Sequence, residues 1–241
     1  MEIIGLILSL IAGLSTLIGY FITYIKFKNI EKLITITLTG SMIIILLISI
    51  FDLLIPNIHS INLFSTILIF ITGLVLTHII SSYLDKKSRE TSNLLKIGII
   101  STICLILHNI PEGIIVLISS MNNTTIGIKT TLSIMLHNIP EGIIISIPLL
   151  YSRVGKRKVF ILTLIASLSE PLGALLSYLI LNKSIISTLP YISILTSGIM
   201  ISLCINIFNE IKNTKYKSLS ILSALICIII YLILSSMQIM N

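Results

Sequence analysis

The hexapeptide HNIPEG occurs at residues 108–113 and again, letter for letter, at residues 137–142. Each copy lies in the middle of a long, otherwise apolar stretch. A histidine, a glutamate and an asparagine are unfavourable in such surroundings unless they are paired, because burial removes their hydrogen bonds to water. The proline adds to the problem, since it removes a backbone donor inside a helix. The repeat therefore predicts a specific interaction that compensates for burying these groups twice.

The composition indicates what surrounds the repeat. Of the 241 residues, 55% are hydrophobic and 10% are charged, and the mean hydropathy is +1.11. Runs of about 18 or more apolar residues are the length that a bilayer requires. Because lipid offers the backbone no hydrogen-bond partners, such runs form helices. We therefore predict an all-α integral membrane protein, a single transmembrane domain over residues 1–241, with eight spans near 3–25, 33–55, 61–83, 97–120, 127–150, 159–181, 187–209 and 218–238.

The basic residues indicate how these spans cross the membrane. Of 16 lysines and arginines, only Lys129 and Lys183 lie outside the loops that follow the first, third, fifth and seventh spans. By the positive-inside rule these four loops are cytoplasmic, and both chain termini are extracytoplasmic. The net charge of +7 is thus a sign of topology rather than of nucleic-acid binding. A cytoplasmic surface attracted to anionic lipid headgroups is also expected.

The spacing within each motif is typical of ligands on one helix face. His108 and Glu112 are four residues apart, as are His137 and Glu141, so each pair projects from the same side of its helix. The amides next to the histidines, at Asn109 and Asn138, point about 100° around the helix and can serve a neighbouring site. Glycines follow each glutamate, and we expect them to let these two helices approach closely.

A third polar group within an apolar span completes the set. Glu170 lies in SEPLGA (169–174), directly before a proline. Two imidazoles, three carboxylates and two amides at one depth favour a divalent transition-metal site with enough ligands for two ions. Nitrogen and oxygen donors without a clear thiolate suit Zn²⁺, Fe²⁺, Mn²⁺ or Cd²⁺, not Cu⁺. The alternative is a hydrogen-bonded polar cluster that only fastens helices together.

The two HNxPEG helices, the SEPLGA segment, the eight spans and the external termini together resemble the ZIP (Zrt/Irt-like protein) metal transporters, particularly their bacterial-type branch. The resemblance implies a 3+2+3 arrangement, in which spans one to three and six to eight are inverted repeats. It implies uptake of divalent metal, chiefly zinc, into the cytoplasm through two adjacent sites. The ion is then the substrate, and no resident cofactor is expected. A homodimer stays open as the oligomeric state. The matching metal ligands are His108, Asn109, Glu112, His137, Asn138, Glu141 and Glu170, with Glu112 and Glu141 as bridges.

Other readings of the same residues stay open. A membrane-embedded metal-dependent hydrolase could use these ligands to activate water, but it needs an open coordination position and a further base. A cation channel is disfavoured because imidazoles hold transition metals tightly. Asp52, about one turn from the external surface, is either an ordinary interfacial residue or the entrance residue that first attracts the cation. The first, third and eighth spans are expected to be scaffold or lipid-facing helices.

Overall fold

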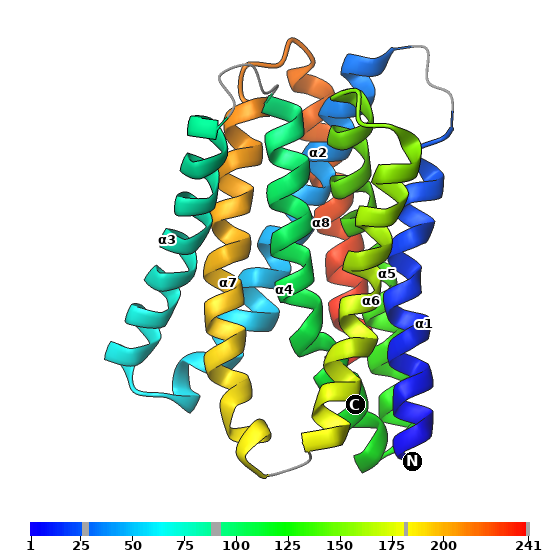
Figure 1. Ribbon diagram of the computed structural model, residues 1–241, viewed down its shortest axis with the longest axis vertical. Helices are drawn as coiled ribbons and strands as arrows, with labels where there is room; N and C mark the ends of the chain where they lie inside the picture. The colour runs from blue at the N-terminus through cyan, green and yellow to red at the C-terminus, as the bar shows by residue number, and fades with distance from the viewer. Residues whose placement is uncertain (26–28, 88–92, 181–182, 240–241) are drawn as a thin grey trace.

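The computed structural model of the chain describes residues 1–25, 29–87, 93–180 and 183–239. These residues form long helices that run up and down a single bundle (Figure 1). Within the described parts of the chain, seven helices are long and apolar enough to cross a membrane, and α8 contains a shorter apolar segment at Lys217–Ile233. The predicted all-helical membrane fold is therefore confirmed. The bounds are α1 Glu2–Ile22, α2 Ile30–Leu47, α3 Leu63–Lys87, α4 Asn93–Asn122, α5 Thr124–Tyr151, α6 Lys156–Ile180, α7 Lys183–Ile211 and α8 Lys217–Ile239.

A tight turn between α4 and α5 brings the two copies of the hexapeptide together. Asn123 is the only residue between the helices, and its side chain caps α5 by accepting hydrogen bonds from the backbone N–H groups of Thr125 and Ile126. His108 precedes this turn by fifteen positions and His137 follows it by fourteen. Because both helices rise by about 1.5 Å per residue, the two motifs lie side by side at one depth.

The second span departs from the single helix expected over residues 33–55. Helix α2 ends at Leu47, and the chain continues as a π-helical segment, Ile48–Leu54, and a 3-10 segment, Ile55–Ser60. Wider π-helical turns are frequent at functional sites because they re-aim side chains. Asp52 lies within this π-helical segment. Hydropathy could not reveal the change, because the apolar run itself continues without interruption.

Four of the helices form one group, and the other four pack as two pairs. Helices α1, α4, α5 and α6 all contact one another, whereas α2 packs on α8 and α3 packs on α7. The C-terminal ends of α1, α3, α5 and α7, which precede the loops where the basic residues gather in the sequence, all lie at one end of the bundle, the upper end in Figure 1. Lys26, Lys28 and Arg89 belong to these loops by sequence but lie outside the described residues.

Glycines permit close contact between α3 and α7. A Cβ placed on Gly73 would lie 2.3 Å from the carbonyl oxygen of Leu195, and one placed on Gly198 would lie 2.3 Å from that of Phe70. These contacts are with backbone atoms, which cannot swing away as the end of a flexible side chain can. Close helix contact through small residues is a main source of association between membrane helices.

Gly73→Ala should therefore destabilise the bundle by about 1–3 kcal/mol, the usual range for overpacking a filled interior. Gly155→Ala is the matched control, because a Cβ there would meet nothing within 4 Å. Thermal unfolding of the purified variants in detergent is the measurement. Equal stability of the two variants would contradict the packing described for α3 and α7.

Candidate metal centre

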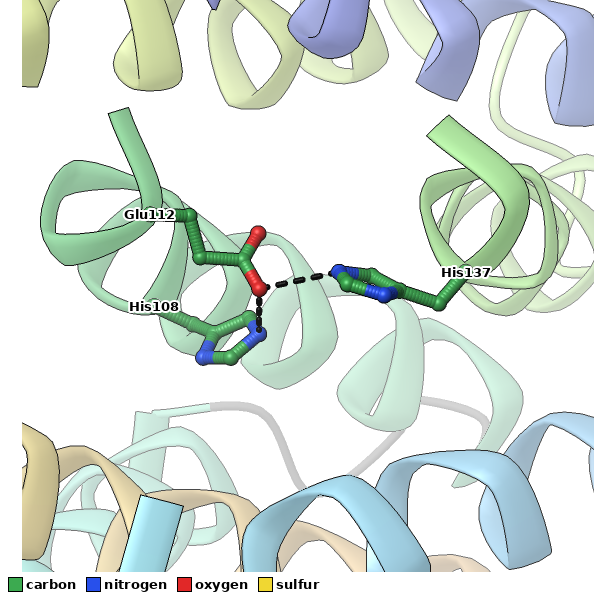
Figure 2. Close-up of side chains that lie close together, drawn as sticks. All are labelled: His108, Glu112 and His137. Carbon is green, nitrogen blue, oxygen red and sulfur yellow. Dashed lines mark hydrogen bonds and ion pairs between the residues drawn. The ribbon is translucent and has the colours of Figure 1, made fainter. Parts of the chain in front are cut away.

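Two imidazoles and one carboxylate converge at the centre of the bundle. Glu112 on α4 lies between the two rings, with its Oε1 3.2 Å from His108 Nε2 and 2.9 Å from His137 Nε2 (Figure 2). One candidate ligand atom from each of the three side chains lies within 4.8 Å of the others. All three side chains are buried. This is the arrangement that the i, i+4 spacing of the motif predicts, extended to the neighbouring helix.

Glu141 adds a second carboxylate from α5. Its Oε1 lies 3.4 Å from His108 Nε2, and the side chain is 0% exposed. Ligands bonded to tetrahedral Zn²⁺ at about 2.0–2.1 Å are about 3.3 Å apart. The separations from His108 to the two glutamates, 3.2 and 3.4 Å, match that spacing. These donors therefore fit a transition-metal ion.

The two asparagines are held so that their amide oxygens stay free. Asn109 Nδ2 donates to the carbonyl oxygen of Ala166 at 3.0 Å, and Asn138 Nδ2 donates to that of Ala12 at 3.0 Å. Because carbonyl oxygens only accept hydrogen bonds, they fix which end of each amide faces them. Both Oδ1 atoms are buried and have no hydrogen-bond partner in the described structure. An amide oxygen without a partner is what a metal ligand requires.

Glu170 on α6 contacts one of the predicted ligands, Asn138. Its Oε2 accepts a 2.8 Å hydrogen bond from Asn138 Nδ2, while its Oε1 is buried without a partner in the described structure. The hydrogen bond places this carboxylate on the asparagine side of the centre. The structure thus separates an imidazole side, around His108 and His137, from an asparagine and Glu170 side.

One expectation about neighbouring helices was wrong. Gly113 and Gly142 do not let α4 and α5 approach each other. A Cβ on Gly113 would lie 1.8 Å from the carbonyl oxygen of Glu170 on α6, and one on Gly142 would lie 1.9 Å from that of Thr16 on α1. Helix α1, which was expected to be a scaffold or lipid-facing helix, therefore packs directly behind the centre. Its plain apolar composition hid this role from sequence reasoning.

A small cavity leads from the centre toward Asp52. The cavity has a volume of about 20 Å³, room for about one water molecule, and both His137 and Asp52 line it. The exposed Asp52 carboxylate accepts a 2.9 Å hydrogen bond from the hydroxyl of Tyr231 on α8. Sequence reasoning missed Tyr231, which is one aromatic residue in an apolar span and carries no signal of its own.

Apolar side chains fill the opposite direction, toward the basic loops. The largest buried hydrophobic cluster draws on the parts of the helices nearest those loops, as the positions of Tyr20, Ile97, Leu149 and Ile211 show. Leu105 and Ile145 bring the cluster within one turn of the polar motifs. The centre is therefore approached by a small cavity that Asp52 and Tyr231 line on one side, and it is covered by packed apolar residues on the other.

Comparison with known proteins agrees with this geometry. The family model described as ZIP Zinc transporter matches residues 78–235. The chain belongs to the ZIP family. It is 35% identical over 199 residues to the zinc transporter ZupT of Lysinibacillus sphaericus (strain C3-41), which covers 72% of this chain and 74% of that relative. It is 32% identical over 200 residues to the zinc transporter ZupT of Chlorobium chlorochromatii (strain CaD3), which covers 73% and 75%.

The family match confirms the resemblance drawn from the hexapeptides and SEPLGA. The matched range begins at His78 and includes α4, α5, α6 and α7, so it contains all seven predicted ligands. Helix α1 lies before the matched range. The individual ligand roles in this ZIP protein stay predictions that the geometry supports.

Glu112→Ala should weaken Zn²⁺ binding to the purified protein by more than about 100-fold, because it removes a donor that touches both imidazoles, whereas outer partners of metal ligands change affinity by about 10–100-fold. His108→Ala should act in the same way. His78→Ala is the matched control, since this exposed histidine lies on α3. Isothermal titration calorimetry is the measurement, and wild-type affinity in either centre variant would contradict the assignment.

Proposed function

We propose that this ZIP-family protein transports divalent transition-metal ions into the cytoplasm, with zinc as the main substrate, through a buried centre that holds two ions. The observation that carries the proposal is the convergence of His108, Glu112, His137 and Glu141 within a membrane-spanning bundle. Buried ionisable groups are disfavoured by several kcal/mol when unpaired. A divalent cation compensates the carboxylates and uses the imidazole nitrogens as ligands.

The donor set favours zinc and metals of similar chemistry. Two imidazoles together with carboxylates suit Zn²⁺, and also Fe²⁺, Mn²⁺ and Cd²⁺. Among the described residues, the candidate ligand cluster contains histidine and glutamate only. Both close relatives named above are zinc transporters by name. The metal is a substrate of transport in this proposal and not a resident cofactor.

The number of donors supports two ions. The seven predicted ligands lie on three helices and outnumber the four positions of a tetrahedral ion. Glu112 and Glu141 each lie close to His108 and are proposed to bridge the two ions. The imidazole ion would take His108 and His137, and the second ion would take the ligands on the other side, which are Asn109, Asn138 and Glu170.

The direction of transport follows from charge and packing. The helix ends that lead into the loops rich in lysine and arginine lie at one end of the bundle, so that end is cytoplasmic by the positive-inside rule, and both termini are extracytoplasmic. Asp52 and the small cavity then lie on the external side. Because apolar residues cover the centre on the cytoplasmic side, release into the cell requires those helices to move.

This packing separates a carrier from an open channel. An open channel needs a continuous path for the ion, whereas the small cavity beside Asp52 reaches His137 and packed apolar residues lie beyond the centre. The hydrolase alternative is not favoured, since the ZIP and ZupT relatives are transporters.

A homodimer with lipid-facing α3 and α8 stays a prediction. The exposed apolar side chains along these two helices, including Phe64, Leu68 and Leu222, would meet lipid or a second subunit.

The direct test is metal flux into sealed proteoliposomes with a zinc-sensitive dye inside. We expect saturable Zn²⁺ influx for the wild type and only background flux for Glu112→Ala at equal protein abundance. Cleavage of lipid and peptide substrates is assayed in parallel. Metal-dependent cleavage without flux would favour the hydrolase, and flux that never saturates would favour a channel.

Asp52→Asn should raise the Michaelis constant for Zn²⁺ uptake by about threefold or more, because the exposed carboxylate attracts the cation before it reaches the centre. The difference between wild type and variant should shrink as salt increases, since exposed charges are screened beyond about 10 Å at 0.1 M. Equilibrium binding at the centre should be almost unchanged. Unaltered uptake kinetics would remove Asp52 from the pathway, and lost central binding would make it a ligand instead.

A further inference from the structure

Helices α1 and α6 carry matching segments on either side of the centre. Residues 12–19 read AGLSTLIG and residues 166–173 read ASLSEPLG, with alanine, leucine, serine and glycine at the same places. Both alanines, Ala12 and Ala166, are fully buried. In both segments the serine hydroxyl donates to the carbonyl oxygen of this alanine at 2.6 Å, from Ser15 in α1 and from Ser169 in α6.

The two segments also make the same contacts with the hexapeptide helices. The alanine carbonyl of α6 accepts from Asn109 on α4, and the alanine carbonyl of α1 accepts from Asn138 on α5, each at 3.0 Å. If α4 is exchanged with α5 and α1 with α6, these two hydrogen bonds therefore exchange places. This relation is the one expected of inverted repeats around a central helix pair.

Thr16 occupies on α1 the place that Glu170 occupies on α6. The carbonyl oxygen of Glu170 abuts Gly113, the residue after Glu112, and the carbonyl oxygen of Thr16 abuts Gly142 in the same way. In both cases a Cβ on the glycine would lie less than 2 Å from the oxygen. The backbone of α1 is thus as close to α5 as that of α6 is to α4.

By the same relation, we expect the Thr16 side chain to point across the centre. The Glu170 carboxylate crosses the centre to Asn138 on α5, and the equivalent path from Thr16 leads toward Asn109 on α4. Thr16 Oγ1 and Asn109 Oδ1 are both buried and have no hydrogen-bond partner in the described structure. An unpaired buried polar atom is disfavoured by about 1–3 kcal/mol. Apart from Ser101, Thr16 is the only unpaired buried side chain outside the predicted ligand set within the described residues.

We propose that the Thr16 hydroxyl belongs to the subsite of the second ion, where it accepts a hydrogen bond from a water ligand of that ion opposite Glu170. The inference rests on the two-ion function proposed above. Threonine is shorter than glutamate, so a bridging water fits its reach better than direct coordination. The second ion then has a carboxylate on one flank and a neutral hydroxyl on the other, which binds it without a fourth negative charge.

The test compares Zn²⁺ stoichiometry and affinity for three variants of the full-length purified protein by calorimetry with elemental analysis. Thr16→Val keeps the branched shape and removes the hydroxyl, whereas Thr16→Ser keeps the hydroxyl. Thr131→Val is the matched control, because this buried threonine on α5 donates to the Gly127 carbonyl. We expect Thr16→Val to weaken the second ion by about 10–100-fold, the range for outer partners of metal ligands, and to leave the first ion unchanged. Thr16→Ser should retain most of the affinity, and Thr131→Val should match the wild type.

The outcomes separate this inference from the function on which it rests. If the wild type binds two ions and Thr16→Val binds them indistinguishably, the role of Thr16 is overturned and the two-ion function stands. Equal loss of both ions in Thr16→Val shows that the residue only shapes the bundle and also overturns the inference. Wild-type protein that binds a single ion overturns the two-ion function together with this role.

Discussion

Ionisable side chains buried between apolar helices require a compensating charge, and the rest of the bundle is arranged around that requirement. The centre contains two imidazoles and three carboxylates, all less than 10% exposed, namely His108, Glu112, His137, Glu141 and Glu170. Hydrogen bonds among them account for only some of their polar atoms. In the proposed function, a divalent cation would supply both the missing charge and the missing partners, which would stabilise this costly cluster in a membrane span.

The backbone around the centre positions the ligands and is itself specified by small residues. Glycines at 113 and 142 bring the carbonyl groups of α6 and α1 against the hexapeptide helices. Alanine carbonyls on the same two helices bind the asparagine Nδ2 groups, and the amide oxygens stay buried without a hydrogen-bond partner in the described structure. Outer contacts of this kind tune a metal site as much as its direct ligands do. They also explain why α1, which supplies no predicted ligand, is part of the centre.

The sequence predicts the helices and most of the centre because those features depend on local spacing. The i, i+4 spacing and the apolar runs are local patterns; His108 and Glu112 do meet on one face of α4, and the apolar runs form the helices. The contacts of Gly113, the role of α1 and the bond from Tyr231 to Asp52 join residues far apart in the chain. The π-helical segment around Asp52 likewise depends on tertiary packing, because nothing in the local composition marks it. These features could not be predicted without the arrangement of the helices.

The central claim is that nitrogen and oxygen atoms of the hexapeptides bind the metal inside the membrane. X-ray absorption spectroscopy at the zinc edge, on purified protein loaded with Zn²⁺ and washed, tests it most directly. The account predicts a first shell of nitrogen and oxygen at about 2.0–2.1 Å, with the outer scattering pattern of imidazole. A first shell dominated by sulfur at about 2.3 Å, or one without imidazole, would contradict it.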